Sequence, residues 1–343
     1  MKKILVVLLA LVLAMSAFVA CAEGKTEFDI RALVWKFDDT YGSSVRQAMM
    51  NAVEPIGAEL GIKINLQMYD AADDMAKQVE QATMLIGEKP DFIIINLAEV
   101  ASGQQLVDMF TDAGIPFLFY NKEPSAETVQ SVVVDAGSIF IGTTPREAGD
   151  MQGEILADIW AVDQSIDLNG DGKLQFVEFE GEPNNPEAIA RTQYSEETAL
   201  LYGVPLEPAL DEYVIVANWD TAQAQEKMTA TFAAHPEIEV VFCNNDNMAQ
   251  GVIAALNAVN MNTGKEGDGK IVVIGVDAID AAFALIKDGQ MTATVKQDGD
   301  AMGYANIRIA ANYLLTGSWL EGTDYAYAAD GYSVRIPYAK ITE

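Results

Sequence analysis

Two hydrophobic patterns alternate along most of the chain. Short runs of β-branched and aromatic residues, such as those at 93–95 and 272–274, are continuously apolar, which is typical of parallel strands covered on both faces. Between them, apolar positions recur every three or four residues, as in 45–56 and 79–86, which predicts helices. The pattern predicts strands over residues 29–35, 62–69, 92–96, 116–120, 174–179, 213–217, 240–243, 271–276 and 291–295.

This alternation predicts an α/β fold. A strand followed by a helix and another parallel strand forms a right-handed βαβ unit, and such units build open sheets with helices on both faces. Nine strands are too many for one comfortable sheet, and 343 residues correspond to roughly two domains. We therefore expect two doubly wound parallel-sheet lobes.

The first 20 residues have the pattern of a secretory signal. Lys2 and Lys3 precede an apolar stretch over 4–20, with an uncleaved anchor as the alternative. Cys21 closes the stretch in a string that resembles a bacterial lipobox, in which the cysteine is acylated. The segment from Ala20 to Ala22 also fits an ordinary signal peptidase site, which would release a soluble form. Both interpretations predict an exported protein, either an envelope lipoprotein anchored at Cys21 or a periplasmic protein.

Charge and composition exclude several functional classes. With 51 acidic and 21 basic residues the net charge is −30, so a basic face that binds nucleic acid is not expected. One histidine leaves almost nothing for Ser-His-Asp, Cys-His or multi-histidine metal chemistry. The apolar fraction of 50% indicates a globular chain. Beyond Cys21 only Cys243 remains, and we expect it to be a small buried apolar residue.

Amides, carboxylates and aromatic residues follow most of the predicted strands. The carboxyl ends of parallel strands meet at one edge of a sheet, where ligands bind in open α/β folds. Helix N-capping by Asp or Asn is the alternative explanation for any one of them. The polar segments are 38–41, 121–122, 218–220, 244–246, Asp277 and 297–298.

Residues 167–175 carry the spacing of an EF-hand-type calcium loop. Oxygen ligands stand at alternate positions and a glycine at the sixth, because a tight loop points every second residue inward around a large, hard cation. The alternative is a solvated acidic turn. The usual twelfth ligand would be Glu178, but on a strand Glu178 and Gln175 point to opposite faces, which leaves the last carboxylate open. The ligands predicted within the loop are Asp167, Asn169, Asp171, the backbone carbonyl of Lys173, and Gln175.

Six strings together resemble the bacterial galactose/glucose-binding proteins. These strings are KFDD at 36–39, FYNKEPS at 119–125, DLNGDG at 167–172, WDTAQA at 219–224, NND at 244–246 and GVDA at 275–278. Proteins of that family are substrate-binding subunits of ABC sugar importers, and in some bacteria they also report to chemoreceptors. The resemblance covers essentially the whole mature chain.

The resemblance implies two sugar-binding lobes in a monomeric protein. Residues 21–143 and 297–335 would form the N-terminal lobe, and 144–296 and 336–343 the C-terminal lobe with the calcium loop. The crossovers would fall near 143–144, 296–297 and 335–336. A monosaccharide would be clamped between the lobes, and closure would signal occupancy to the membrane permease.

The resemblance also implies the residues that bind the sugar. Tyr41 and Trp219 occupy the positions of two aromatic side chains that sandwich a pyranose, and Glu239 that of the sixth calcium ligand, which we prefer to Glu178. The matching rim residues are Asp39, Asn121, Arg191, Asn245 and Asp277. Three positions depart from the family: Asn185 replaces a histidine, Glu187 an aspartate and Gln297 an asparagine.

Several ligands and roles remain open at this point. D-galactose or D-glucose is the leading ligand, and because Glu187 stands where the family reads the anomeric hydroxyl, another aldose or a hexoside is the alternative. A sensor-only receptor without transport is a second alternative. A sugar-active enzyme using Asp38, Asp39 and Asp277 is a remote alternative. A sugar-responsive repressor is not expected, because it would carry a basic helix-turn-helix where this sequence has the signal pattern.

Overall fold

The computed structural model describes residues 24–129 and 137–342, in two compact units. The signal peptide predicted over 1–20 and the acylation predicted at Cys21 lie outside the described residues. The first unit takes in residues up to 38, 42–141 and 300–334, and the second takes in 39–41, 142–299 and 335–343. Within the described ranges, no helix is long and apolar enough to cross a membrane.

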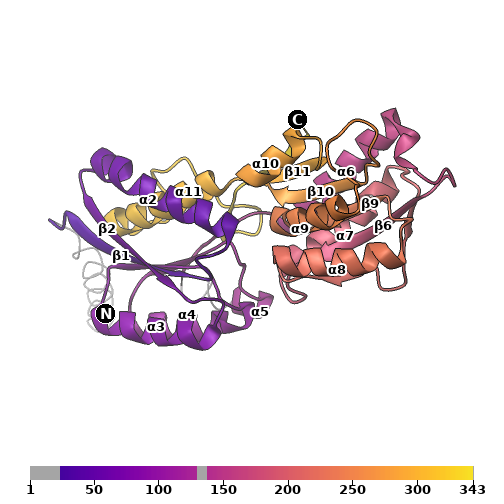
Figure 1. Ribbon diagram of the computed structural model, residues 1–343. Helices are drawn as coiled ribbons and strands as arrows, with labels where there is room; N and C mark the ends of the chain where they lie inside the picture. The colour runs from indigo at the N-terminus through magenta and orange to yellow at the C-terminus, as the bar shows by residue number, and fades with distance from the viewer. Residues whose placement is uncertain (1–23, 130–136, 343) are drawn as a thin grey trace, which may run out of the picture. The chain divides into compact units, whose positions relative to one another are not determined.

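The first unit is a doubly wound sheet with the strand order β12-β5-β4-β3-β1-β2. The pairs from β2 through β5 are parallel. In Figure 1, α2 and α11 lie on one side of this sheet, and α3 and α4 lie on the other. The elements are β1 (Glu27–Val34), α2 (Thr40–Leu60), β2 (Lys63–Asp70), α3 (Met75–Glu88), β3 (Phe92–Ile95), η1 (Val100–Ser102), α4 (Gly103–Ala113), β4 (Phe117–Tyr120), α5 (Ala126–Val129), β5 (Phe140–Gly142), α11 (Gly299–Thr316) and β12 (Ser333–Arg335).

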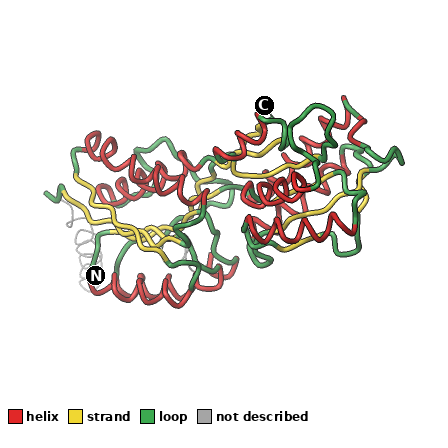
Figure 2. The backbone as a smooth tube through the Cα atoms, in the orientation of Figure 1, coloured by secondary structure: helices red, strands yellow, loops and turns green. Residues whose placement is uncertain are grey.

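The second unit repeats this topology with the strand order β13-β11-β10-β9-β6-β7, and β8 also pairs with β6. Its pairs are parallel except β11 with β13. Figure 2 shows the strands of each unit between layers of helices. The elements are α6 (Pro145–Val162), η3 (Gln164–Ile166), β6 (Leu174–Glu180), α7 (Pro186–Leu201), β7 (Leu206–Pro208), β8 (Val214–Val216), α8 (Thr221–Ala234), β9 (Val240–Cys243), α9 (Asp246–Ala258), β10 (Val272–Asp277), α10 (Asp280–Lys287), β11 (Ala293–Gln297) and β13 (Tyr338–Ile341).

The continuous apolar strands are buried on both faces, as their sequence predicts. Successive side chains of a strand point to opposite faces, so each strand of the second sheet contributes to two cores. Val241 and Cys243 pack with α8, α9 and α10 on one face. Val240 and Phe242 pack with α6 and α7 on the other face. Cys243 is fully buried, so its expected role as a small apolar residue is confirmed.

The predicted fold class is confirmed, and all nine predicted strands are present with ends that differ by two residues or fewer. The sequence pattern missed β5, β7, β12 and β13. Each of these strands has only three or four residues and contains a glycine, a proline or a charged residue, whereas the equally short β3, β4, β8 and β9 are continuously apolar.

The units divide near the crossovers that the resemblance implies, with two differences. The boundaries fall at 141/142, 299/300 and 334/335. Gln297, expected in the N-terminal lobe, belongs to the second unit because β11 continues through it and pairs with Tyr338 of β13. Residues 39–41, also expected in the N-terminal lobe, group with the second unit.

Close packing of α6 on α7 fixes the position of α7, the helix that carries several predicted site residues. A Cβ atom on Gly149 would lie 2.9 Å from the carbonyl oxygen of Ala190, and one on Gly153 only 2.6 Å from that of Ser195. Both contacts are shorter than real Cβ atoms tolerate, so the two helices approach through glycine. Thr198 adds a hydrogen bond from its hydroxyl to Asp150 Oδ1 at 2.7 Å.

We expect Gly153→Ala to destabilise the protein by about 1–3 kcal/mol, because the added methyl group forces α6 and α7 apart. Gly87→Ala is the matched control, since nothing lies within 4 Å of the corresponding position in α3. There the helix propensity of alanine should raise the free energy of unfolding by up to about 1 kcal/mol. Urea denaturation measures both, and equal stabilities of the two variants would contradict this account of the interface.

Candidate ligand-binding site

The strand order of the second unit places a topological switch point between β6 and β9. The chain leaves β6 toward β7 and β8 on one side and then returns to β9 on the other. Ligands of open α/β sheets bind outside the carboxyl ends of the strands at such a point. Here Gly181 follows β6 and Asn244 follows β9, and the Gly181 N–H donates to Asn244 Oδ1 at 3.1 Å.

Helix α7 begins beside this edge. Asn185 is its N-cap, and Asn185 Oδ1 accepts a hydrogen bond from the Glu187 N–H at 2.9 Å, while Pro186 fits the first helical position. Glu187 and Arg191 are therefore one turn apart on the same face, where they form an ion pair of 3.3 Å. Both are buried, with 8% and 3% of their surface exposed.

The Arg191 guanidinium is held by four acceptors. Its Nη1 donates to the carbonyl oxygen of Asn244 at 2.7 Å. Its Nη2 lies 3.3 Å from Glu187 Oε2, 3.0 Å from Gln297 Oε1 and 2.8 Å from the Tyr338 hydroxyl. Its Nε is buried and has no hydrogen-bond partner within the described chain. Buried donors are rarely left unpaired, so this N–H is a ready donor for a ligand oxygen.

Trp219 lies beside Arg191 in a strained loop. Asn218 and Trp219 both have left-handed backbone angles, with φ of 51° and 61°. The indole covers Gly181 so closely that a Cβ atom there would lie 2.2 Å from Trp219 Cε2. The Arg191 guanidinium carbon is 5.8 Å from the centre of the indole ring. Among the described residues, Trp219 Nε1 is buried without a hydrogen-bond partner.

Two carboxyl groups complete this edge. Burial raises the pKa of Asp277 well above its usual range, while the charge of Arg191 lowers it and that of Asp246 raises it further. Burial likewise raises the pKa of Asp246, whose carboxylate accepts from the Thr294 hydroxyl at 2.7 Å and the Ile279 N–H at 3.1 Å. Asp246 is therefore held by the protein, while Asp277 ends strand β10 at the site.

The remaining predicted residues are placed as follows. Asn245 is the N-cap of α9, and its Oδ1 accepts from the Met248 N–H at 2.9 Å. Asp220 caps α8 in the same way and accepts from the Gln223 N–H at 2.8 Å, so the N-capping alternative holds for both residues. Tyr41 is buried, and that burial, together with the charge of Asp277, raises the pKa of its hydroxyl. Asp39, half-buried, groups with the second unit as Tyr41 does.

The first unit carries its own polar edge at the carboxyl end of β4. Asn121 adopts a left-handed φ of 64° directly after that strand. The next residue, Lys122, is 4% exposed, and its Nζ donates to the Ala98 carbonyl oxygen at 3.2 Å. The same Nζ lies 3.8 Å from the centre of the Trp35 ring.

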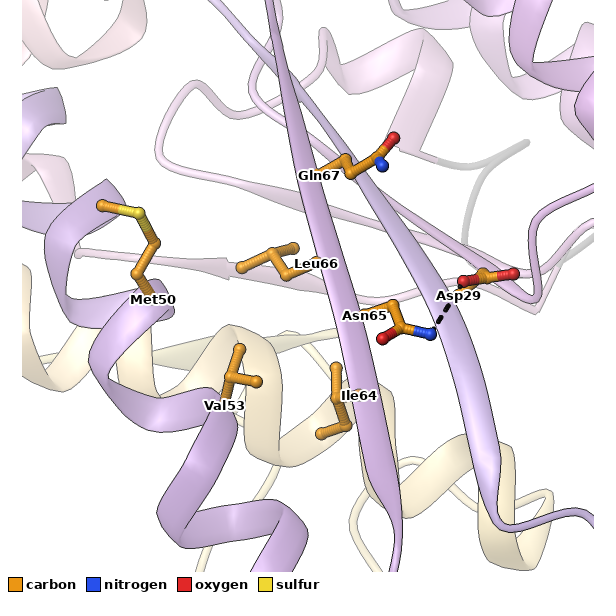
Figure 3. Close-up of a pocket in the computed structure, with 7 residues that line it drawn as sticks. All are labelled: Asp29, Met50, Val53, Ile64, Asn65, Leu66 and Gln67. Atoms are coloured by element: carbon orange, nitrogen blue, oxygen red, sulfur yellow. Dashed lines mark hydrogen bonds between the residues drawn. The ribbon is translucent and has the colours of Figure 1, made fainter.

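A hollow of about 580 Å³ in the first unit lies away from the predicted site residues. Figure 3 shows it along helix α2 and edge strand β2, with Asn65 Nδ2 donating to Asp29 Oδ1 at 3.2 Å. None of the predicted sugar or calcium ligands lines it. Its lining residues are Asp29, Met50, Val53, Ile64, Asn65, Leu66 and Gln67.

The predicted calcium loop meets Glu239 and not Glu178. Glu239 is 1% exposed, and its Oε1 accepts from the backbone N–H groups of Leu168 at 2.6 Å and Asn169 at 3.0 Å. Its Oε2 accepts from the Gln175 N–H at 3.3 Å. The Asp167 carboxylate accepts from the N–H groups of residues 170–172 at 2.6–3.2 Å, which curls the loop around it.

Glu178 is buried in the core on the opposite side of β6. Its Oε1 accepts from the Ser195 hydroxyl at 2.7 Å, and its Oε2 has no hydrogen-bond partner among the described residues. Burial raises the pKa of this carboxyl well above its usual range, the Ser195 hydrogen bond lowers it, and Glu196 and Glu180 raise it further. The strand alternation therefore separates Gln175 from Glu178, as the sequence predicts.

Comparison with known proteins identifies the family. A family model described as the periplasmic binding protein domain matches residues 33–318. The chain belongs to the periplasmic binding protein family. Members of this family are binding proteins exported to the periplasm and are not enzymes.

The relatives of this periplasmic binding protein carry names of sugar-binding proteins. The D-galactose/methyl-galactoside binding periplasmic protein of Haemophilus influenzae is 32% identical over 314 residues, 91% of this chain and 88% of the relative. The ribose import binding protein of Bacillus subtilis is 25% identical over 304 residues, 87% and 85% of the two chains. An ABC transporter solute binding protein from Bacillus halodurans, solved with bound myo-inositol, superposes with a TM-score of 0.73 at 25% identity, covering 93% of this chain and 96% of that one.

Sequence reasoning missed several residues of this binding protein's site. Tyr338 and Thr143 carry no motif, although both lie beside crossovers that the resemblance implies. Asn244 and Asp246 stand in the NND string, but nothing in the string shows that a backbone carbonyl and a buried carboxyl would be used. Only the fold brings these groups to α7.

The burial of Glu178 predicts a pH-dependent stability. The pKa of Glu178 in the folded state lies above its ordinary value of 4.5, so the folded protein favours the protonated form. This contribution is fully present below pH 4.5 and is lost as the pH rises through the folded-state pKa. Glu178→Gln, which stays neutral, should therefore gain stability relative to the unchanged protein as the pH rises from 4.5 to 8.

Urea denaturation across that pH range measures the difference. Glu212→Gln is the control, since Glu212 is exposed and precedes the neighbouring strand β8. A Glu178→Gln profile parallel to that of the unchanged protein would mean that Glu178 is charged in the folded state.

Proposed function

We propose that this chain is the extracytoplasmic sugar-binding component of an ABC importer, with D-galactose or D-glucose as its ligand. The observation that carries the proposal is the carboxyl edge of the second unit, where a buried arginine, a buried carboxyl and an indole converge on the switch point. The relative from Haemophilus influenzae, named for D-galactose and methyl-galactoside, supports the choice of hexose.

The chemistry of this edge suits a pyranose. One face of a pyranose presents C–H groups, which stack on an aromatic ring, while its hydroxyl rim both donates and accepts hydrogen bonds. Trp219 offers the ring, and Asp277 offers acceptor oxygens. The buried N–H groups of Arg191 and Trp219, unpaired within the described chain, offer donors for hydroxyl oxygens.

The proposed mechanism is closure around the sugar. Tyr41 would stack on the second face of the ring, while Asp39 and Asn121 would bind hydroxyl groups. A ligand that contacts both lobes stabilises the closed state over the open one, and closure would signal occupancy to the permease. A chemoreceptor as a further partner, a lipid anchor at Cys21 and a monomeric state belong to the same proposal.

One observation favours a second class of ligand, another aldose or a hexoside. Glu187 Oε1 accepts from the Thr143 hydroxyl at 2.6 Å, and Oε2 accepts from Tyr338 and Arg191. Both oxygens of Glu187 are thus engaged by protein groups, which weakens its use as an acceptor for a sugar hydroxyl. A ligand with a substituent at that position would be tolerated.

We expect Trp219→Ala to weaken the binding of D-galactose or D-glucose by about 100-fold, because a buried aromatic contact in a binding site contributes more than 2 kcal/mol. Asp39→Ala should weaken it as well. Trp319→Ala is the control, since this indole stacks on Tyr313 and donates to Gly137 at the amino-terminal edge of the first sheet. Isothermal titration calorimetry measures each affinity.

Retention of wild-type affinity by both Trp219→Ala and Asp39→Ala would show that the sugar binds elsewhere. A panel of pentoses, hexoses, inositols and methyl hexosides, screened by thermal shift, separates the two ligand classes. If methyl galactoside shifts the melting temperature more than galactose does, the second class is favoured.

We further propose a structural calcium ion in the loop at 167–175. The donor set is chemically suitable, because all six groups offer oxygen, the ligand that Ca²⁺ prefers. Within the described ranges no group of three or more His, Cys, Asp and Glu residues is arranged to hold a metal, so the proposal rests on the spacing of the loop and not on a preformed cluster of its three carboxylates. The hydrogen bonds of Glu239 to the loop support its role as the last ligand. The proposed ligands are Asp167, Asn169, Asp171, Lys173 through its carbonyl, Gln175 and Glu239.

EDTA should lower the melting temperature of the protein by several degrees, and added Ca²⁺ should restore it, because an ion that binds only the folded state stabilises it by mass action. Glu239→Gln should abolish this calcium response. Glu178→Gln is the matched control and should keep the response, since Glu178 bonds to Ser195 in the core. An EDTA-independent melting temperature of the unchanged protein would exclude the calcium site.

A further inference from the structure

Apart from the short segment 39–41, the chain passes between the two units at three places, and a side chain of the second unit stands next to each of them. The two long segments of the second unit start at residues 142 and 335, and the first of them ends at 299. Thr143, Gln297 and Tyr338 each lie within three residues of one of these boundaries. All three are buried, with 0%, 4% and 5% of their surface exposed.

All three side chains bond to the same ion pair on α7. The Thr143 hydroxyl donates to Glu187 Oε1 at 2.6 Å. Gln297 Oε1 accepts from Arg191 Nη2 at 3.0 Å. The Tyr338 hydroxyl accepts from Arg191 Nη2 at 2.8 Å and lies 3.0 Å from Glu187 Oε2. The three connections are therefore all hydrogen-bonded to the Glu187–Arg191 pair at the carboxyl edge of the second sheet.

Tyr338 is the centre of this network. Its hydroxyl also lies 3.0 Å from Thr143 Oγ1, so its single proton faces two acceptors, Thr143 and Glu187. Its ring centre is 5.8 Å from the Arg191 guanidinium carbon. Tyr338 is paired with Gln297 across β13 and β11, which places two of the three connections side by side.

We propose that Tyr338 is a positioning residue for the ligand site, whose hydroxyl fixes the Glu187–Arg191 pair to the chain connections at Thr143, Gln297 and Tyr338 itself. This inference rests on the proposed function for its effect on sugar binding. Without the hydroxyl, Arg191 loses an acceptor and Glu187 loses a donor in a buried place, where unpaired polar groups are costly. The guanidinium then loses its fixed orientation toward a ligand and toward the indole of Trp219.

The first test is Tyr338→Phe, which removes only the hydroxyl. We expect its Kd for D-galactose or D-glucose to rise by about 10- to 100-fold, the effect of losing one hydrogen bond in a buried charged network. Tyr332→Phe is the matched control, because the Tyr332 hydroxyl also bonds to a carboxylate, that of the half-buried Glu123, but in the first unit. This control should leave the Kd unchanged while both variants lose some thermal stability.

A second pair of variants distinguishes the loss of a hydrogen bond in the network from a general loss of stability. Thr143→Val has nearly the same volume but no hydroxyl, and we expect it to weaken sugar binding as Tyr338→Phe does. Thr143→Ser keeps the hydroxyl and should retain the affinity. Equal affinities of the valine and serine variants would contradict the proposal, even if Tyr338→Phe fails to fold.

A measurement without ligand tests whether the Tyr338 hydroxyl holds the three connections in place. Hydrogen–deuterium exchange of the sugar-free protein should show faster exchange in all three connections, 142–144, 296–299 and 335–339, in Tyr338→Phe and not in Tyr332→Phe. Unchanged exchange there, or faster exchange with unchanged sugar affinity, would overturn the proposal. If the unchanged protein binds neither sugar, the proposed function fails, and the exchange result still accepts or rejects the positioning role of Tyr338.

Discussion

The buried guanidinium of Arg191 holds together the carboxyl edge of the sheet in the second unit, where we propose that the ligand binds. Removing the Arg191 charge from water is costly unless nearly every donor finds an acceptor. Its acceptors come from α7 itself and from the ends of β9 and β11 and the start of β13. These elements are far apart in sequence, so the charge can be satisfied only when the whole sheet is assembled. Folding of the unit and formation of the site are therefore the same event.

Glycine residues allow the elements around Arg191 to pack closely. Gly149 and Gly153 let α7, the helix that carries Arg191, approach α6 closely. Gly181 leaves room for the indole of Trp219, and the left-handed angle of Trp219 aims the ring across that gap. A side chain at any of these three glycines would displace α7 or the indole of Trp219, so the packing of the unit and the geometry of the proposed site are not separable here.

The sequence was sufficient for the features that depend on local pattern. Strand positions followed from apolar runs, and the separation of Gln175 from Glu178 followed from strand alternation. It was insufficient where a role depends on partners. The polar residues Asp220 and Asn245 are N-caps, which their position after a strand could not distinguish from ligand binding. Tyr338 carries no local signal at all, because its role arises only when β13 pairs with β11 and brings its hydroxyl to α7.

The charges at this edge also constrain what it can hold. Glu187 already neutralises Arg191 at 3.3 Å, and the second guanidinium nearby, that of Arg335, donates to the carbonyl oxygen of Thr143 at 2.6 Å. Asp246 and Asp277 add two buried carboxyl groups. Burial raises the pKa of each, which favours the protonated, neutral form. A sugar acid or sugar phosphate would bring a further negative charge beside Glu187, Asp246 and Asp277, at a cost that rises in a buried, low-dielectric place. A neutral polyol adds no charge, and its hydroxyl groups can donate to the carboxyl oxygens and accept from the Arg191 Nε–H. The buried carboxyl groups of this edge therefore favour an uncharged, hydroxyl-rich ligand, whichever epimer it is.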